Sequence, residues 1–375
     1  MKIAIVDTYY PAFLNQFDSN KETLSRSYSD TKTMLMEHFF GTSDAYSSAL
    51  SSLGWQAEEI VPNFVALQTQ WATENSIPYL AFLDQIPPSY LSRIPLLGGL
   101  WTYFPTLQHL LDRQIDVIAP DVVYFQDLNF PSTYLLKKLR KKGRLVVGQI
   151  ASPLPPDSRL RCFDVIVSSL PNIVDKVRTL GVNAEFLPIA FDSRVLDYLD
   201  QSDTAQIGVS FIGGITPRHR STIPLLEAVA RICPELRVYG YGAELIQGNS
   251  ILTTHHHGER WGLDMYDTLR NSKVTLNRHI DIAESFANNM RLFEATGVGT
   301  LLVTENKSNI RDYFEPGVEI LTYDSPQDAA ELCRWSLDNR DNAEAIARAG
   351  QERTLRDHTY AKCMVHLDSI LRRYM

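Results

Sequence analysis

Short runs rich in Val, Ile and Leu alternate with longer amphipathic stretches along much of the chain. Apolar runs of this length, bounded by charged residues or by Pro and Gly, are typical of strands buried on both faces. In the first half these runs are residues 3–6, 122–125, 145–150, 165–168 and 185–189. Helical patterns at residues 132–142 and 172–180 separate the later runs. The alternation predicts a parallel sheet wound by crossover helices, in a Rossmann-like arrangement.

Residues 20–110 depart from this alternation. One amphipathic helix is clear there, because four apolar residues recur at i, i+3, i+4 and i+7, namely Tyr46, Ala49, Leu50 and Leu53. Gly54 ends that helix, and residues 55–61 form the predicted second strand. Residues 63–101 are rich in aromatics, Gln and Pro without a steady period. We interpret them as an inserted helical layer, which either packs irregularly on the core or serves as a lid or acceptor surface.

A second alternation follows Asp192. Its strand-like runs are residues 209–212, 237–239, 274–277, 301–304 and 320–323. Its helical patterns include residues 264–271, 290–296, 328–339, 342–356 and 360–375. Open α/β sheets bind ligands at the carboxyl ends of their strands. We therefore expect two doubly wound domains, at residues 1–195 and 205–355, that face each other across a cleft and are followed by a final helix at 356–375.

The composition narrows the class of protein. The chain has 375 residues, a formal net charge of -8 and 44% hydrophobic residues, as in globular proteins of two domains. An acidic chain lacks the basic field that a general nucleic-acid-binding surface needs. Charged residues interrupt each apolar run before the ~18 residues of a membrane span. The N-terminal run is not a signal peptide, and the four cysteines are widely spaced, so we expect a reduced, cytoplasmic protein without an integral membrane segment.

Candidate chemistry concentrates in residues 288–300. Asn289 and Arg291 open a predicted helix, whose first turn offers free backbone N–H groups to an anion. Arg291 adds a forked cation that suits phosphate oxygens, and Glu294 lies three residues further on, beside the place of a ribose. The same i, i+3 spacing also fits a surface ion pair worth about a few tenths of a kcal/mol.

A second candidate follows the strand at 209–212, where Gly213 and Gly214 lead to Arg218 and Arg220. Paired glycines after a strand let the backbone approach a ligand closely. Either arginine can neutralise a diphosphate as it becomes a leaving group, and the sequence does not rank the two. A turn with solvated arginines is the alternative interpretation.

Polar residues also follow other predicted strands. Asn277 and His279 come directly after the strand at 274–277 and are candidates to line the ligand site. Three consecutive histidines, at residues 255–257, point to alternate sides of an extended chain. We therefore predict that they are surface or loop residues and that they form no metal site.

Two aspartates at strand ends are candidates for acid–base chemistry. Asp127 follows the strand at 122–125, where a carboxylate could deprotonate an acceptor hydroxyl. Asp7 lies at the matching end of the first strand. Either residue could instead cap a turn or a helix.

Several motifs of the second half, taken in order, resemble a known family. They are residues 272–277, 289–295, 317–319, 349–353 and 358–360. This combination is similar to the C-terminal domain of CgeB-like glycosyltransferases, which belong with the group-1 glycosyltransferases of the GT-B fold. The resemblance covers about residues 205–370, and in the first half it rests on residues 120–123, 168–169 and 181–192. It implies an α/β GT-B fold whose final helix crosses back onto the N-terminal domain.

The resemblance implies a hexosyltransferase that moves a sugar from a nucleotide-diphosphate donor to a carbohydrate, lipid-linked or protein acceptor. The C-terminal domain would hold the donor, with Glu294 accepting hydrogen bonds from the ribose and the loop before Tyr266 contacting the base. The family's other glutamate is replaced by Phe286, and Glu284 lies two residues out of register. Because no Asp-x-Asp motif occurs, arginines and a helix end are expected to neutralise the diphosphate without a metal or other cofactor.

Three other classes stay open. A sugar-nucleotide epimerase or a phosphorylase has the same fold. A non-catalytic nucleotide- or carbohydrate-binding protein is favoured by the loss of a glutamate at Phe286. A dinucleotide oxidoreductase is disfavoured, because no Gly-x-Gly-x-x-Gly follows residues 3–6.

Overall fold

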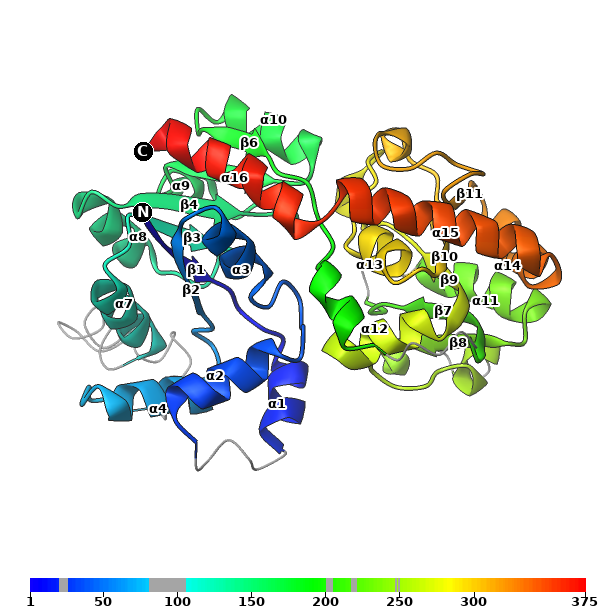
Figure 1. The fold of residues 1–375 in the computed structure, drawn as a ribbon, viewed down its shortest axis with the longest axis horizontal. Helices are drawn as coiled ribbons and strands as arrows, with labels where there is room; N and C mark the ends of the chain where they lie inside the picture. The colour runs from blue at the N-terminus through cyan, green and yellow to red at the C-terminus, as the bar shows by residue number, and fades with distance from the viewer. Residues whose placement is uncertain (20–25, 81–105, 200–204, 217–220, 247, 249) are drawn as a thin grey trace. The chain divides into compact units, whose positions relative to one another are not determined.

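The computed structural model describes all residues except 20–25, 81–105, 200–204, 217–220, 247 and 249. The chain divides into two compact units (Figure 1). Unit 1 consists of Met1–Leu187 together with Met364–Met375, and unit 2 is Pro188–Cys363. Each unit is an α/β structure built on one parallel sheet.

Unit 1 contains a six-stranded sheet in the order β2-β1-β3-β4-β5-β6. The strands are β1 (Lys2–Val6), β2 (Gln56–Ile60), β3 (Val122–Phe125), β4 (Leu145–Gln149), β5 (Val165–Ser168) and β6 (Ala184–Phe186), and each neighbouring pair is parallel. Strands β3 and β5 are buried throughout, which explains their unbroken apolar sequences. Strand β6 is shorter than predicted, because Pro188 has no N–H to continue the ladder.

The helices of unit 1 include the predicted crossovers α8 (Thr133–Lys141) and α10 (Pro171–Thr179). The others that the structure describes before the end of the sheet are α1 (Pro11–Ser19), α2 (Tyr28–Met36), α3 (Ala45–Ser52), α4 (Val65–Glu74), α7 (Leu107–Ile118) and α9 (Asp157–Leu160). Helix α4 contacts both α2 and α7, so the described part of residues 20–110 does contain a packed helical layer. Much of residues 63–101 lies outside the described residues.

Unit 2 contains a five-stranded parallel sheet in the order β11-β10-β9-β7-β8. Its strands are β7 (Ile207–Ile212), β8 (Leu236–Tyr239), β9 (Ser272–Asn277), β10 (Leu301–Glu305) and β11 (Leu321–Tyr323). Its α-helices are α11 (Thr222–Ile232), α12 (Gly262–Arg270), α13 (Arg291–Gly297), α14 (Pro326–Asp338) and α15 (Arg340–Asp357). Short 3-10 helices are η3 (Ser193–Asp197), η5 (Ala243–Leu245), η6 (Ile251–Thr254), η7 (Asp281–Ala283) and η8 (Ile310–Asp312). Helices α11 and α14 pack together over one face of the sheet, around Val229 and Cys333.

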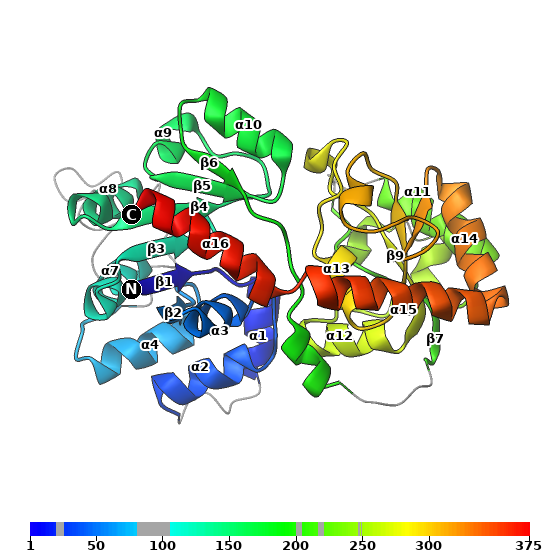
Figure 2. The same cartoon turned by 45° about the horizontal axis from the view of Figure 1, so that its top comes forward.

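The last helix, α16 (Tyr360–Tyr374), begins in unit 2 and ends in unit 1. Its residues from Met364 onward belong to unit 1, as the predicted crossing requires. In both views the helix lies against the sheet of unit 1 (Figures 1 and 2). The Trp55 Nε1–H donates to Asp368 Oδ1 at 2.6 Å, beside the β2 edge, and the Tyr374 hydroxyl donates to Glu185 Oε1 at 2.9 Å, on β6 at the other edge.

The described helices include none with the length and apolar character needed to cross a bilayer. The four cysteines are free and buried.

The apolar face of α16 provides a test of the crossing. Leu367 is fully buried, so Leu367→Ala should lower the free energy of unfolding by ~2–5 kcal/mol, through lost burial and a residual cavity. Val365 on the same helix is exposed, and Val365→Ala should change it by less than about 0.5 kcal/mol. Urea denaturation of both variants checks the difference, and equal small effects would mean that α16 does not depend on this face.

Candidate functional site

The carboxyl edge of the unit 2 sheet is built from glycine-bearing loops after β7 and β8. Gly213 N–H donates to the Tyr239 carbonyl, and Ile215 N–H donates to the Tyr241 carbonyl, both at 2.9 Å. A Cβ on Gly240 would lie 2.1 Å from the Gly213 oxygen. Because Gly240 also has a φ of 139°, only glycine fits this close approach of the two loops.

Gly214 faces a ring of the same neighbouring loop. A Cβ at Gly214 would lie 2.2 Å from Cζ of Tyr241, and that ring stacks on Trp261 with the planes 15° apart. The paired glycines therefore let the two loops pack, which is a role that the sequence pattern did not reveal. Residues 217–220 lie outside the described residues, so the roles of Arg218 and Arg220 at the diphosphate stay predictions.

Helix α13 carries the Arg291–Glu294 pair. Arg291 Nη1 lies 2.8 Å from Glu294 Oε2, so the i, i+3 ion pair forms. It is not a surface pair, because the two side chains are only 14% and 7% exposed. The Arg291 Nε is buried with no acceptor within the described part of the chain. A buried donor without a partner is unfavourable by about 1–3 kcal/mol, and sites that await a ligand are where such donors are tolerated.

Asn289 fixes the start of the same helix. Its Oδ1 accepts a hydrogen bond from the Arg291 N–H at 2.6 Å, and its Nδ2 donates to the Arg278 carbonyl at 3.0 Å. Helix α13 has only seven residues, so its dipole contributes little to anion binding. The charge of Arg291 is therefore the main electrostatic feature here.

Tyr266 of α12 lies near Glu294. Its ring is buried, and the Glu294 carboxylate acts on its hydroxyl. Burial, followed by the carboxylates of Glu294 and Asp192, raises the pKa of Tyr266 well above its usual value. The hydroxyl therefore stays protonated at physiological pH. Tyr266 thus lies at the site beside Glu294, as a neutral side chain.

Asn277 and His279 form a buried network at the ends of β9 and β10. Asn277 Nδ2 donates to Thr304 Oγ1 at 3.0 Å, and His279 Nε2 lies 3.2 Å from the same oxygen. His279 Nδ1 accepts from the Asn288 N–H, so the proton of the neutral ring belongs on Nε2. Burial and the charge of Lys307 lower the pKa of His279 to about 3. His279 is therefore neutral at physiological pH, and it orders the loop before α13.

Glu284 has an unusual backbone in that loop. Its φ of 54° and ψ of -115° correspond to the first central residue of a type II′ turn, a position that favours glycine. The Phe286 N–H closes the turn onto the Ala283 carbonyl at 2.8 Å, and Lys307 Nζ donates to the Glu284 carbonyl at 3.0 Å. A non-glycine residue in such a conformation costs about 1–3 kcal/mol, and such strain concentrates at functional sites.

The carboxyl edge of the unit 1 sheet gathers carboxylates. Thr8 joins the two predicted aspartates: its N–H donates to Asp7 Oδ1 at 2.8 Å, and its hydroxyl donates to Asp127 Oδ2 at 3.0 Å. Asp127 Oδ1 also accepts the Asn129 N–H at 2.8 Å, as in the predicted turn cap. Burial and, to a smaller extent, the charge of Asp127 raise the pKa of Asp7 to about 7.

Glu59 is a member of this edge that the sequence did not reveal. It is the fourth residue of β2, is buried, and accepts the Ser47 N–H at 3.0 Å. Burial raises the pKa of its carboxyl to about 8. In the sequence it is the second of two adjacent glutamates, Glu58 and Glu59, and only the strand alternation separates the buried one from the more exposed one.

The three histidines lie in a loop, and they do not converge. His255 Nδ1 bonds to the Leu236 carbonyl and His256 Nε2 to the Gly240 carbonyl, both at 2.8 Å. His257 contacts the Tyr239 ring. His255 is buried, so this member of the triple is not a surface residue. Within the described ranges no group of three His, Cys, Asp or Glu side chains is arranged to hold a metal ion.

Comparison with known proteins identifies one family and several solved structures that resemble this chain. Residues 218–369, which are 152 of the 375 residues, match the model of a family described as glycosyl transferase-like. HepE from Anabaena, solved in complex with UDP-glucose, aligns over 100% of both chains with 14% identity and a TM-score of 0.61. Sucrose-phosphate synthase from Thermosynechococcus elongatus aligns over 100% of this chain and 98% of that one, with 13% identity and a TM-score of 0.59. No curated protein sequence matches the chain.

At sequence identities this low, the structural alignments establish the fold of this chain and nothing more. Two parallel sheets with flanking helices give this chain the architecture of the GT-B glycosyltransferases. The predicted resemblance to the group-1 glycosyltransferases of that fold is confirmed, and the narrower likeness to CgeB-like proteins stays a prediction.

The strained turn at Glu284 generates a stability test. Glu284→Gly should raise the free energy of unfolding by about 1 kcal/mol, because relief of the positive-φ strain outweighs the extra entropy of glycine in the unfolded chain. Glu284→Ala removes the same carboxylate and keeps the strain, so it should give no gain. Chemical denaturation compares the two variants, and an equal response would show that the backbone is not strained.

Proposed function

We propose that this protein is a hexosyltransferase that moves a sugar from a nucleoside diphosphate sugar to an acceptor hydroxyl. The observation that carries the proposal is the buried Arg291–Glu294 pair, at the carboxyl edge of the unit 2 sheet and inside the region that matches the glycosyl transferase-like family. Support also comes from HepE, a neighbour in fold that was solved with UDP-glucose.

In this proposal unit 2 holds the donor. Arg291 contacts the diphosphate through the donors that Glu294 leaves open, including the unpartnered Nε. Glu294 accepts hydrogen bonds from the ribose hydroxyls, with its orientation fixed by the ion pair with Arg291. Arg218 and Arg220 stabilise the charge that develops on the leaving diphosphate, in place of a divalent cation.

Glu294→Gln tests the donor site. The amide keeps the size of the side chain and loses its charge, so the affinity for the nucleoside diphosphate should fall by ~1–3 kcal/mol, the range for hydrogen bonds to a charged group. Calorimetry with UDP, GDP and ADP, without added metal, measures the loss.

Glu352 serves as the control, because it is an exposed glutamate of the same unit and Glu352→Gln makes the same change of charge. Thermal unfolding verifies that each variant is folded. Unchanged affinity in folded Glu294→Gln would reduce Glu294 to a structural residue, and failure of all three nucleotides to bind the unmodified protein would refute the donor site.

The carboxylates of unit 1 supply the general base in the proposal. A base works best when its pKa is near the operating pH, and Asp7, with a pKa of about 7, meets that condition. Thr8 ties Asp7 to Asp127, whose negative charge helps to keep the Asp7 pKa high. Asp127 thus either raises the pKa of Asp7 or accepts the proton of the acceptor hydroxyl itself.

The pH dependence of transfer separates these two roles. If Asp7 is the base, kcat/KM should rise as pH increases through about 7, because Asp7 accepts a proton only after losing its own. Asp7→Asn should lower kcat by ~10²–10⁴, and Asp127→Asn should shift the midpoint to lower pH by removing a neighbouring negative charge. The reverse result, with activity lost only in Asp127→Asn, would assign the base to Asp127.

A non-catalytic nucleotide-binding protein is the second candidate, favoured by Phe286 at the place of a family glutamate. Incubation with UDP-glucose and a panel of acceptors distinguishes the two. Release of UDP together with glycosylated product supports the transferase, whereas tight UDP binding without turnover supports the binding protein.

A further inference from the structure

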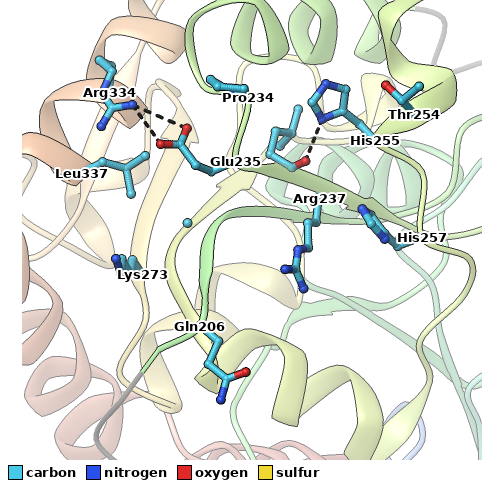
Figure 3. A pocket seen from close by; sticks show the side chains of 12 residues that line it. Gln206, Pro234, Glu235, Arg237, Thr254, His255, His257, Lys273, Arg334 and Leu337 are labelled. Carbon is cyan, nitrogen blue, oxygen red and sulfur yellow. Dashed lines mark hydrogen bonds and ion pairs between the residues drawn. The ribbon is translucent and has the colours of Figure 1, made fainter.

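A pocket opens at the edge of the unit 2 sheet opposite the donor site (Figure 3). It has a volume of about 570 Å³, and it is lined from the amino-terminal ends of β7, β8 and β9, where Gly208, Arg237 and Lys273 lie. Gly213 and Asn277, which border the donor site, lie at the other ends of these strands. This pocket therefore takes no part in the site described above.

Two cations that have no partner among the described residues line this pocket. Gly208 of β7 lies opposite Lys273 of β9, and a Cβ at this glycine would come 2.6 Å from Cβ of Glu235. The side chains of Lys273 and Arg237 are exposed, and neither has a hydrogen bond or ion pair among the residues that the structure describes. Figure 3 shows them on either side of the pocket.

The acidic residue of the pocket does not compensate them. Glu235 is paired with Arg334, with 3.2 Å between Nη1 and Oε1, and Arg334 also binds Asp338 at 2.7 Å. His257, on the wall next to Arg237, has its pKa lowered by partial burial and then by positive neighbours, of which Arg237 is the first and His255, His256 and Arg260 follow. The pocket therefore presents a net positive field.

A second pocket of about 490 Å³ continues the same surface and shares Lys273 and Leu337 with the first. The linings of the two pockets together contain six cationic side chains, Arg237, Arg270, Lys273, Arg334, Arg340 and Arg348, against two carboxylates, Glu235 and Glu344. Glu344 is paired with Arg340 at 2.6 Å. Such a local positive surface stands out on a chain with a formal net charge of -8.

We infer that these joined pockets bind an anion that carries at least two phosphate groups. Clustered cations in a concave surface match clustered phosphates, because arginine forks pair with phosphate oxygens and lysine adds a point charge. Arg237 and Lys273 lie on either side of the pocket, so a separate phosphate group can pair with each of them. The phosphates belong to a soluble polyphosphate or to the head group of a phosphorylated lipid, which share this chemistry.

Tripolyphosphate is the first probe, and calorimetry on the full chain measures its affinity. Removing both of these cations, in Arg237→Gln/Lys273→Gln, should weaken binding roughly tenfold or more, because two charged donors to the phosphate oxygens are lost. Arg231→Gln/Lys362→Gln removes the same charge from other exposed positions of unit 2 and should leave binding unchanged. Equal binding by the two double variants would overturn the assignment, because the ligand would then lie elsewhere, such as at the donor site.

Histidine NMR gives an independent readout. Bound phosphates next to His257 should raise its pKa by offsetting the positive charge of Arg237, and His257→Gln identifies the signal.

Binding to vesicles that contain phosphatidylinositol bisphosphate separates the two sources of phosphate. If the protein binds these vesicles but not tripolyphosphate, with the same dependence on Arg237 and Lys273, the ligand is a lipid head group. If neither probe binds, or if the His257 pKa does not move on binding, the inference is wrong.

Discussion

Parallel pairing of the strands is the constraint on which the rest of the structure depends. In a parallel sheet the carboxyl ends of all strands meet at one edge, so loops that are far apart in the sequence become neighbours there. Thr8 and Asp127 are separated by 119 positions, yet Thr8 joins Asp127 to Asp7 for this reason. The same rule brings Gly213 next to Gly240, and Asn277 next to Thr304.

The carboxyl edge of the unit 2 sheet is held together by interactions that do not favour stability by themselves. Taking an ion pair such as Arg291 and Glu294 out of water carries a desolvation penalty that the mutual attraction only partly offsets. The buried His279 is held neutral, and Glu284 has a conformation that suits glycine. These features lie on the loop between β9 and α13 or on α13 itself, while the strands beneath are ordinary apolar core. Burial of the apolar strands in the sheet therefore offsets the unfavourable free energy of this loop.

Sequence patterns predicted the strands well, because buried parallel strands are continuous apolar runs and helices repeat every 3.6 residues. They predicted the crossing of α16 only through the family resemblance, since the spacing of Leu367 and Leu371 fits packing on either unit. Spacing also could not show that Arg291 and Glu294 are buried, because an i, i+3 pair has the same pattern on a surface. Glu59 was missed because a buried glutamate and a solvent-facing glutamate look the same in the sequence of a strand. Only the position of the neighbouring helix shows that Glu59 is buried.

The path of α16 has a consequence for how the chain is made. The sheet of unit 1 is built from residues 2–186, yet Met364, Leu367, Ile370 and Leu371, which are buried in the same unit, are synthesised long after β6. Synthesis at about 5–20 residues per second leaves that apolar surface uncovered for roughly ten seconds or more after β6 has emerged. Unit 2 can form during this interval, because all of its strands precede α16. The synthesis of unit 1 therefore begins before that of unit 2 and is completed after it.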